Sequence, residues 1–365
     1  MKGLVMEDLV MEDTVMQGTA IKHTVNPASL ALIADIGGTN ARFALTDLSA
    51  PDAQVLDARS LDASAFASLQ HAAEHYLSAV GVQPRRAAIA VASPVNGEEI
   101  RLTNRAWSFT RSELQRSLGL DHLHVLNDFG AVAWSVPALS ETDTITVHGS
   151  DDAPLHGPVS VLGPGTGLGV AMLVGGDASD RGRHWQVVET EGGHISFAPL
   201  GEEELAIARW FTARFGRVSN ERLLCGSGLS HIDAVLRGAV DHTTGQHQDL
   251  REPADIVAAA LEGHDLAARR TLARFCAVLG SGAGDAALIH GARTVMLAGG
   301  IVPRFVPFLR SSAFRERFLA KGRFAPYLET VTIRVITHSG PGLLGAAMSL
   351  RASASNARAA NETTR

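Results

Sequence analysis

Hydrophobic residues in the first part of the chain occur in short runs that alternate with longer segments of helical spacing. The runs predict strands over residues 30–36, 41–45, 87–91 and 123–126. The longer segments predict helices over residues 63–80 and 110–118. Thr110 lies three residues before Glu113, which is the spacing of a capping box at a helix start. Strands that alternate with helices in this way predict an α/β layer.

The rest of the chain begins with strands and then becomes mainly helical. Further strands are predicted over residues 159–162, 169–174, 185–189, 295–297 and 330–336. Helical spacing covers residues 202–215, 220–237, 254–261, 265–290 and 343–350. Residues 353–365 have no core pattern, so we expect a frayed tail there.

Composition narrows the functional classes. The chain has 365 residues, of which 45% are hydrophobic and 19% charged, as in a soluble globular protein of about two domains. Its formal net charge of -6 argues against a nucleic-acid partner, because such surfaces are basic. Lysine occurs only at Lys2, Lys22 and Lys321, so the chain has no GxxxxGK[ST] phosphate loop.

Cysteine usage and apolar runs indicate a cytoplasmic protein without a membrane anchor. Cys225 and Cys276 are too few for a disulfide framework or a cysteine zinc cluster. Residues 1–27 carry too many acids for a signal peptide, and we expect this extension to be disordered. The uncharged run 159–176 has a glycine-rich centre, which predicts a hairpin rather than a membrane span. No zinc or EF-hand motif occurs, so any metal is expected to be Mg²⁺ that arrives with a nucleotide.

A glycine turn directly follows the first predicted strand. The turn and its flanks contain Asp35, Gly37, Gly38, Thr39 and Asn40. Glycine allows backbone N–H groups to approach an anion, the two polar residues add donors, and Asp35 is placed to hold a metal-bound water. The turn is therefore a candidate phosphate loop. An ordinary hairpin with an aspartate at the strand end explains the same residues equally well.

A second glycine loop lies between two apolar strands, and its sequence is Gly163-Pro164-Gly165-Thr166-Gly167-Leu168-Gly169. Two such loops in a chain without a P-loop lysine suggest a split phosphate clamp, which would involve Gly165, Thr166 and Gly167 here. A structural hairpin that needs several positive φ angles is the alternative. Gly299 and Gly300 end a later strand, where a flat ring could lie against the backbone.

Acidic residues follow other predicted strands. Asp128 could take a proton from a substrate hydroxyl while Asn127 binds a neighbouring hydroxyl, although local sequence favours an Asx helix cap. Glu191 and His194 flank a pair of glycines and could face one pocket, but such residues at turns are usually only solvated. Glu221 opens a helix, where the helix dipole alone explains an acid.

Taken in order, these motifs closely resemble those of the bacterial ATP-dependent glucokinase family, over residues 30–350. The shared motifs are Asp35-x-Gly-Gly-Thr-Asn, Leu102-Thr103-Asn104 with Trp107, Asn127-Asp128-Phe129, the second glycine loop, Glu191-Gly192-Gly193-His194, Glu221-Arg222-Leu223-Leu224, Ala298-Gly299-Gly300 and Pro341-Gly342-Leu343-Leu344-Gly345. Each motif alone is weak to moderate, whereas their order and spacing are specific.

The resemblance implies an α/β fold of the two-domain actin-like (ribonuclease H-like) ATPase type, with the active site in a cleft between the domains. A small α/β domain would cover residues 28–138, with helix 337–352 packed back on it. A large α/β domain would cover residues 139–336, and residues 353–365 would be a flexible tail.

The resemblance also implies the activity, phosphorylation of D-glucose by Mg-ATP, and the role of each candidate residue. Asp128 would be the general base, and the residues binding glucose hydroxyls would be Asn127, Glu191, His194 and Glu221. The ATP site would contain Asp35, Gly37, Gly38, Thr39, Asn40, Gly165, Thr166, Gly167, Gly299 and Gly300. Mg²⁺ would be held through ATP and a water on Asp35, without a direct protein ligand. A homodimer is expected from the resemblance alone.

Three other functions compete with this hypothesis. A kinase for mannose, fructose or glucosamine would use a similar site, and sequence does not set the preference. A sugar-responsive repressor would need an N-terminal DNA-binding unit, for which residues 1–27 are too short and too acidic. A filament or chaperone ATPase on the same scaffold would lack the Asn-Asp and Glu-Gly-Gly-His segments.

Overall fold

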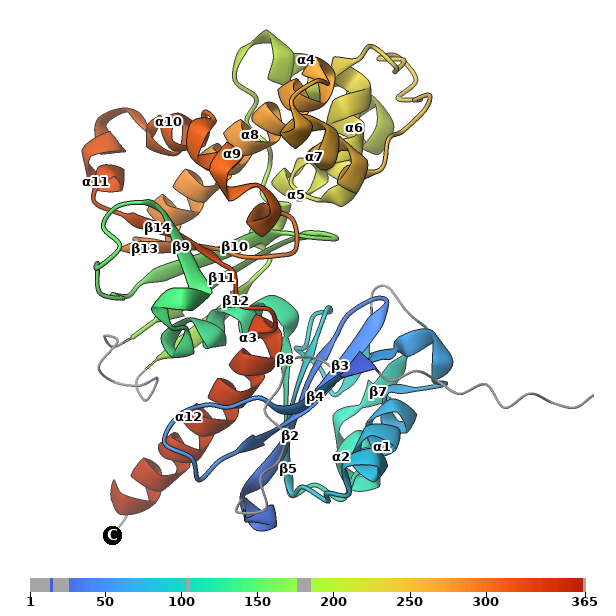
Figure 1. Cartoon of the computed structure of the whole chain (residues 1–365), viewed down its shortest axis with the longest axis vertical. Coiled ribbons are helices and arrows are strands. Elements are labelled where there is room, and N and C mark those ends of the chain that lie inside the picture. The colour runs from blue at the N-terminus through green and yellow to red at the C-terminus, as the bar shows by residue number, and fades with distance from the viewer. Residues whose placement is uncertain (1–13, 16–25, 103–105, 176–184, 364–365) are drawn as a thin grey trace, which may run out of the picture. The chain divides into compact units, whose positions relative to one another are not determined.

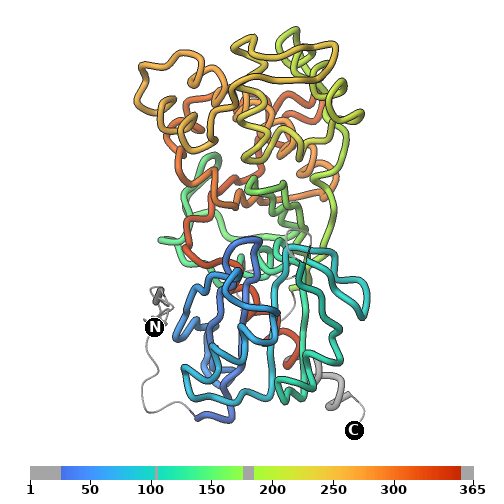
Figure 2. Tube along the Cα trace, turned by 90° about the vertical axis from the view of Figure 1, so that its right-hand side faces the viewer, coloured from blue at the N-terminus to red at the C-terminus, as the bar shows by residue number. Residues whose placement is uncertain are grey.

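In the computed structural model, residues 14–15, 26–102, 106–175 and 185–363 are described, with the backbone alone for 14–15 and 355–363. These residues form two compact units (Figure 1). Unit 1 holds the residues up to Ala131 together with Gly342–Ala357, and unit 2 holds Val132–Pro341 and the last residues from Arg358. In Figure 2 the red C-terminal helix lies among the blue and cyan segments of unit 1. The chain therefore leaves unit 1, builds unit 2 and then returns.

Unit 1 is built on a six-stranded mixed sheet in the order β1-β4-β3-β2-β5-β8. Its strands are β1 (Thr14–Val15), β2 (Leu30–Ile36), β3 (Asn40–Asp47), β4 (Leu56–Asp62), β5 (Arg86–Val91) and β8 (His122–Asn127). Strands β2, β5 and β8 are parallel neighbours, whereas β3 is antiparallel to β2. A separate ribbon pairs β6 (Glu99–Arg101) with β7 (Ser108–Thr110). The helices are α1 (Leu69–Val80), α2 (Arg111–Ser117), the start of α3 (Asp128–Ser135) and α12 (Pro341–Thr363).

Both faces of β2 are buried, which explains its continuous apolar run. Leu32 and Ile36 belong to one core cluster, and the alternate residue Ile33 is equally buried on the opposite face. Gly342, at the start of α12, lies against Asp35, which shares the face of Ile33. Helix α12 therefore covers the second face of the sheet.

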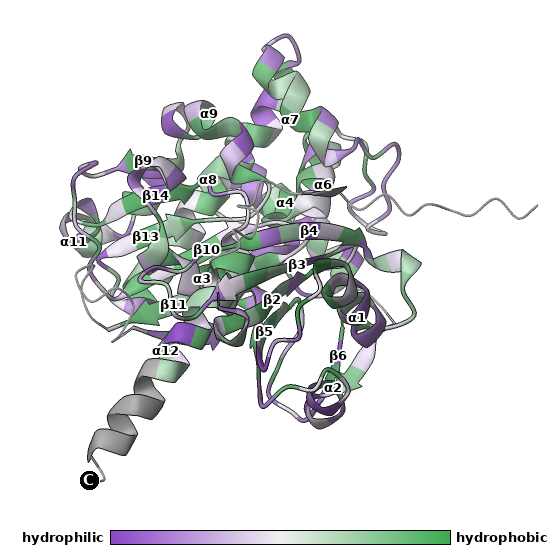
Figure 3. Ribbon diagram, turned by 60° about the horizontal axis from the view of Figure 1, so that its bottom comes forward, coloured by the Kyte–Doolittle hydropathy of each residue, from purple (hydrophilic) through white to green (hydrophobic). Residues whose placement is uncertain are grey.

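Unit 2 contains a second six-stranded sheet in the order β12-β11-β10-β13-β14-β9. Its strands are β9 (Thr144–His148), β10 (Val159–Pro164), β11 (Leu168–Val174), β12 (Gln186–Thr190), β13 (Thr294–Leu297) and β14 (Thr332–Ile336). Its helices are α4 (Gly201–Phe215), α5 (Asn220–Leu223), α6 (Gly226–Leu236), α7 (Pro253–Glu262), α8 (Leu266–His290), α9 (Val306–Ser311), α10 (Phe314–Leu319) and α11 (Ala325–Glu329). In Figure 3 strands β2, β5 and β10 are largely green, as expected for strands that form the cores.

Helix α8 is the central helix of unit 2. Among the described residues it is the one helix long and apolar enough to cross a membrane, and 61% of its most apolar stretch is buried inside the protein. The core cluster of unit 2 includes Leu272, Phe275 and Leu279 of α8, all fully buried. The apolar composition of α8 is therefore accounted for by its place in this core.

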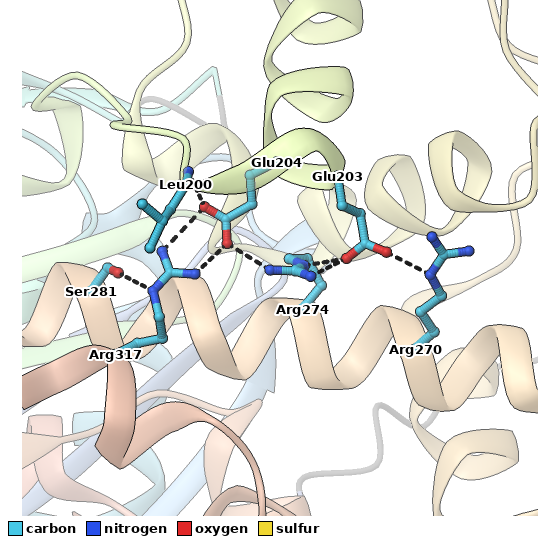
Figure 4. A network of polar contacts seen from close by, with 7 residues as sticks. All are labelled: Leu200, Glu203, Glu204, Arg270, Arg274, Ser281 and Arg317. Atoms are coloured by element: carbon cyan, nitrogen blue, oxygen red, sulfur yellow. Dashed lines mark hydrogen bonds and ion pairs between the residues drawn. The ribbon is translucent and has the colours of Figure 1, made fainter. Parts of the chain in front are cut away.

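A buried ion network joins α4, α8 and α10 (Figure 4). The Glu204 carboxylate is fully buried and accepts hydrogen bonds from the Leu200 N–H at 2.7 Å, Arg274 Nη1 at 2.8 Å and Arg317 Nη1 at 2.5 Å. Burial alone would raise the pKa of Glu204, but the hydrogen bonds from Arg317, Leu200 and Arg274 lower it below its usual value. Glu203 continues the network to Arg274 and to Arg270.

Several predicted boundaries are corrected. The predicted helix 63–80 begins only at Leu69, because Ser68 has an extended backbone and accepts a hydrogen bond from the third residue of the helix. The predicted helix 220–237 is two helices, separated at Leu224 and Cys225. Strands β4 and β9 were not predicted.

The ends of the units also differ from the prediction. Residues 132–138, predicted in the small domain, belong to unit 2, as do residues 337–341. Helix α12 begins at Pro341 rather than residue 337, because proline suits a first helical turn, and its backbone stays helical to Thr363, beyond the predicted end at 352. Most of the expected disordered extension 1–27 lies outside the described residues, although Thr14–Val15 pairs with β4.

Candidate active site

The first predicted loop is a tight hairpin between β2 and β3. The Gly37 N–H donates to the Asn40 carbonyl at 2.9 Å, and the strand register places Asp35 opposite Arg42. The turn residues are exposed or half-exposed, and they are Gly37, Gly38, Thr39 and Asn40. The loop is therefore a hairpin, a geometry that fits both the candidate phosphate loop and the ordinary structural hairpin.

Asp35 is the sheltered group of this hairpin, with 19% of its side chain exposed. Arg42 Nη1 lies 3.3 Å from Asp35 Oδ2. Burial is the larger effect and raises the pKa of Asp35, against the opposing effect of Arg42. A Cβ on Gly342 would lie 2.8 Å from Asp35 Cγ, so only glycine allows α12 to begin this close to the carboxylate.

Asn127 and Asp128 mark the junction of β8 with α3. Asn127 Oδ1 accepts hydrogen bonds from the Phe129 N–H at 2.9 Å and the Gly130 N–H at 3.3 Å, so Asn127 caps α3. Asp128 Oδ1 accepts from the Phe129 N–H at 2.8 Å. The Asx cap that local sequence favoured is therefore present. It uses the oxygen of Asn127 and holds the half-buried Asp128 at the strand end.

The parallel strands bring Asp35 and Asp128 to the same edge of the unit 1 sheet. Asp35 is opposite Ala90 of β5, and the next residue of β5, Val91, is opposite Asn127. Because β2 and β8 are two strand spacings apart, their backbones are separated by about 10 Å. The carboxyl ends of parallel strands are where α/β proteins commonly hold their ligands.

The second predicted loop is the β10–β11 hairpin. Its tip is closed by the Gly165 N–H, which donates to the Gly167 carbonyl at 2.8 Å, and Gly226 of α6 donates to the Gly165 carbonyl at 2.9 Å. Thr166, between the two glycines, is exposed. The loop is thus held in shape by its own backbone and by the first turn of α6.

Gly299 and Gly163 allow a close backbone contact beside this loop. A Cβ on Gly163 would lie 2.3 Å from the Ala298 carbonyl oxygen, and one on Gly299 would lie 2.4 Å from the Pro164 carbonyl oxygen. Gly299 also has φ +87°, a value that favours glycine. By contrast, a Cβ on Gly300 would meet nothing within 4 Å, so Gly300 faces open space.

Three predicted sugar-binding residues of unit 2 lie together. His194 Nε2 is 3.9 Å from Glu191 Oε2, and His194 Nδ1 is 3.7 Å from Glu221 Oε1. The exposed fractions of the Glu191, His194 and Glu221 side chains are 68%, 55% and 30%. Glu221 Oε2 also accepts from the Leu168 N–H at 3.1 Å. The cluster therefore adjoins the second glycine loop.

Sequence reasoning missed two parts of this cluster. Arg217 Nη2 donates to the His194 carbonyl at 2.5 Å and so holds the His194 turn, and the Leu168 amide binds Glu221. An isolated arginine and a backbone N–H carry no sequence signal.

Of the motifs that support the resemblance, Thr103 and Asn104 lie outside the described residues. Among the described residues, no group of three or more His, Cys, Asp or Glu side chains is arranged to hold a metal.

Two α/β units with mixed sheets and a glycine hairpin in each define the actin-like class of two-domain proteins. The glucokinase family model matches residues 32–353. A glucokinase of Tolumonas auensis is 40% identical over 89% of this chain and 98% of its own length. A glucokinase of Xanthomonas campestris pathovar campestris is 43% identical over 88% and 95%. The chain belongs to the glucokinase family.

Solved structures support the same fold. The crystal structure of a glucokinase from an Antarctic psychrotroph is 34% identical, with a TM-score of 0.76 over 88% of this chain and 98% of that one. The glucokinase of Balamuthia mandrillaris, crystallised with glucose, is 22% identical, with a TM-score of 0.69 over 89% and 94%, and this likeness concerns the fold alone.

Proposed function

We propose that this protein is a glucokinase, which transfers the γ-phosphoryl group of ATP to D-glucose and releases ADP and glucose 6-phosphate. The observation that carries the proposal is the cluster of Glu191, His194 and Glu221 beside the second glycine loop, in a chain of the glucokinase family. Carboxylates and an imidazole accept and donate hydrogen bonds, which suits a ligand rich in hydroxyl groups.

Asp128 is the proposed general base. Its carboxylate is held at the carboxyl end of β8 and takes the proton of the attacking sugar hydroxyl. Asn127 uses its oxygen to cap α3, and its amide nitrogen donates to the Ser93 carbonyl at 3.4 Å, so a sugar hydroxyl would bind the amide group beside that contact. A positioned base contributes on the order of 10²–10⁴ in rate.

The proposed ATP site uses both glycine hairpins. Backbone N–H groups of Gly37–Asn40 and Gly165–Gly167 would bind phosphate oxygens, and the backbone beside Gly299 and Gly300 would lie near the adenosine. Asp35 suits Mg²⁺, because it offers carboxylate oxygens and Mg²⁺ usually keeps several waters between itself and the protein. Mg²⁺ would neutralise phosphate charge during transfer, as in other phosphoryl-transfer enzymes. We further propose a cytoplasmic homodimer.

ADP formation with Mg-ATP tests the proposal against a panel of glucose, mannose, fructose, glucosamine and no sugar. Strong stimulation by glucose alone is the expected result. Equal release of ADP without sugar would instead identify an ATPase, and a stronger response to another sugar would move the preference to that hexose.

Replacement of Asp128 tests the assignment of the base. Asp128→Ala is expected to lower kcat by on the order of 10²-fold or more, because the proton acceptor is lost, while ATP binding persists. Turnover close to that of the unmodified protein would remove Asp128 from this role. Binding of ATP by the variant, measured by calorimetry, is the control for its fold.

A further inference from the structure

The backbone of Leu168 contacts both segments of the sugar-binding cluster. Leu168 is the first residue of β11, directly after the tip of the second glycine loop. Its N–H donates to Glu221 Oε2 at 3.1 Å. Its carbonyl oxygen lies only 2.1 Å from the position that a Cβ on Gly193 would take. The loop proposed to bind nucleotide and the turn proposed to bind sugar are therefore in direct contact within unit 2.

Glycine at position 167 leaves room for the Glu221 carboxylate on the loop side of this contact. A Cβ on Gly167 would lie 2.6 Å from Glu221 Oε2, so the carboxylate, at the far end of its side chain, would have to move away. A Cβ on Gly165, two residues earlier in the same loop, would meet nothing within 4 Å. The glycine at position 167 thus makes room for the Glu221 carboxylate, and the glycine at position 165 does not.

The residues next to Glu221 are hydrogen-bonded to the segment that follows the His194 turn. The Asn220 N–H donates to the Ile195 carbonyl at 2.9 Å, and the Phe197 N–H donates to the Val218 carbonyl at 3.1 Å. Ser219 caps α5 and accepts from the Arg222 N–H. A movement of the sugar cluster would therefore be transmitted to the glycine loop through Glu221.

We propose that Glu221 is a tether that couples sugar and nucleotide binding inside unit 2, an inference that rests on the proposed function. One carboxylate oxygen, Oε2, holds the Leu168 N–H and so supports the loop at its β11 end, in addition to the contacts that the tip makes with its own backbone and with α6. The other oxygen, Oε1, faces His194 and is the one available to a sugar hydroxyl. Glucose that fixes this carboxylate also orders the loop, and by linkage the bound nucleotide strengthens glucose binding by the same factor.

Calorimetric titration of the full-length protein with each ligand alone tests the tether. Glu221→Ala is expected to weaken MgADP binding without sugar by about five- to twentyfold, the usual range of such couplings, in addition to weakening glucose binding. The matched control is Glu191→Ala. Glu191 is an acid of the same cluster but, unlike Glu221, it has no hydrogen bond to the loop among the described contacts, so this variant should weaken glucose binding only. Glu221→Gln keeps an oxygen acceptor for the Leu168 N–H and should largely restore MgADP binding.

The reciprocal experiment starts from the loop. Gly167→Ala displaces the Glu221 carboxylate and is expected to weaken glucose binding in the absence of nucleotide, whereas Gly165→Ala is expected to leave glucose binding unchanged. Circular dichroism checks that each variant is folded. If Gly167→Ala does not fold, the comparison of Glu221→Ala with Glu191→Ala tests the tether instead.

The outcomes separate the tether from the proposed function. If Glu221→Ala and Glu191→Ala both leave MgADP binding unchanged, the tether is refuted while the glucose site stands. If the unmodified protein does not bind glucose but Glu221→Ala still weakens MgADP binding, the proposed function fails and the tether between Glu221 and the loop is supported.

Discussion

A buried histidine should make unit 2 sensitive to mild acid. His231 of α6 is 9% exposed and is surrounded by aromatic rings, with centroid distances of 5.2 Å to Trp210 and 5.7 Å to Phe215. His247 lies 5.6 Å away, and the guanidinium groups of Arg214 and Arg222 lie over the Phe215 ring. Burial first, and then Arg214, His247 and Arg222, lower the pKa of His231 from 6.5 to about 4.

The sign of the effect follows from proton linkage. A histidine with a lower pKa in the folded state is protonated first in the unfolded chain, so acid favours unfolding. Above pH 6.5 both states are neutral and His231 contributes nothing. With pKa values of about 4 and 6.5, the free energy of unfolding falls by about 2 kcal/mol at pH 5 and about 3 kcal/mol at pH 4.

Hydrogen exchange of α6 peptides at pH 7 and pH 5 measures this loss in unit 2 itself, and so avoids the assumption that two units unfold together. The variant His231→Leu has no titrating group at this position. Between pH 7 and pH 5, the free energy of opening of α6 should therefore fall by about 2 kcal/mol less in the variant than in the unmodified protein. The comparison of the two proteins cancels the intrinsic pH dependence of exchange. Equal losses in both proteins would refute the reasoning.

Two further predictions concern stability and kinetics. Glu204→Gln leaves Arg317 as a buried charge without its carboxylate, so the free energy of unfolding should fall by about 3–5 kcal/mol in urea titration. Glu202→Gln, on the exposed side of the same helix, should change it by less than about 0.5 kcal/mol. Gly193→Ala forces a Cβ against the backbone oxygen of Leu168 and should lower kcat/KM for glucose by on the order of 10²-fold in steady-state assays. A Cβ in Gly192→Ala would meet the side chains of Val170 and Thr190 at 2.9–3.2 Å rather than a backbone oxygen at 2.1 Å, so this variant should have a smaller effect; equal effects would contradict the argument.

Regular elements were predictable where apolar spacing and a local cap agree. The predicted bounds of β2 are confirmed, and Thr110 caps α2 through the Glu113 N–H at 3.2 Å. The break between α5 and α6 was not predictable, because apolar spacing continues across Cys225 while its extended backbone and sulfur cap α6. Strand β9 was missed since it is an edge strand of half-buried residues with no continuous apolar run.

The candidate site shows the same limit. Spacing alone suggested that Glu191 and His194 share a pocket, because they flank one turn. Glu221 reaches them through an isolated bridge between Ser196 and Ser219, a long-range contact that no local pattern encodes. The roles of these residues stay predictions, whereas membership of the glucokinase family, suggested by the motifs, is confirmed by the comparisons.

The return of the chain to unit 1 has a consequence for the order of synthesis. The strands of unit 1 are made before those of unit 2, yet α12, which covers the second face of β2, is made only after residues 132–340 of unit 2. Ile33 and its neighbours on that face therefore stay uncovered while some two hundred residues are translated, which takes on the order of 10–40 s at usual rates. Unit 2 can complete its core before unit 1 does, so the half that begins first is finished last. During that interval the apolar second face of the unit 1 sheet lacks its covering helix, and transiently exposed apolar surface of this kind favours aggregation.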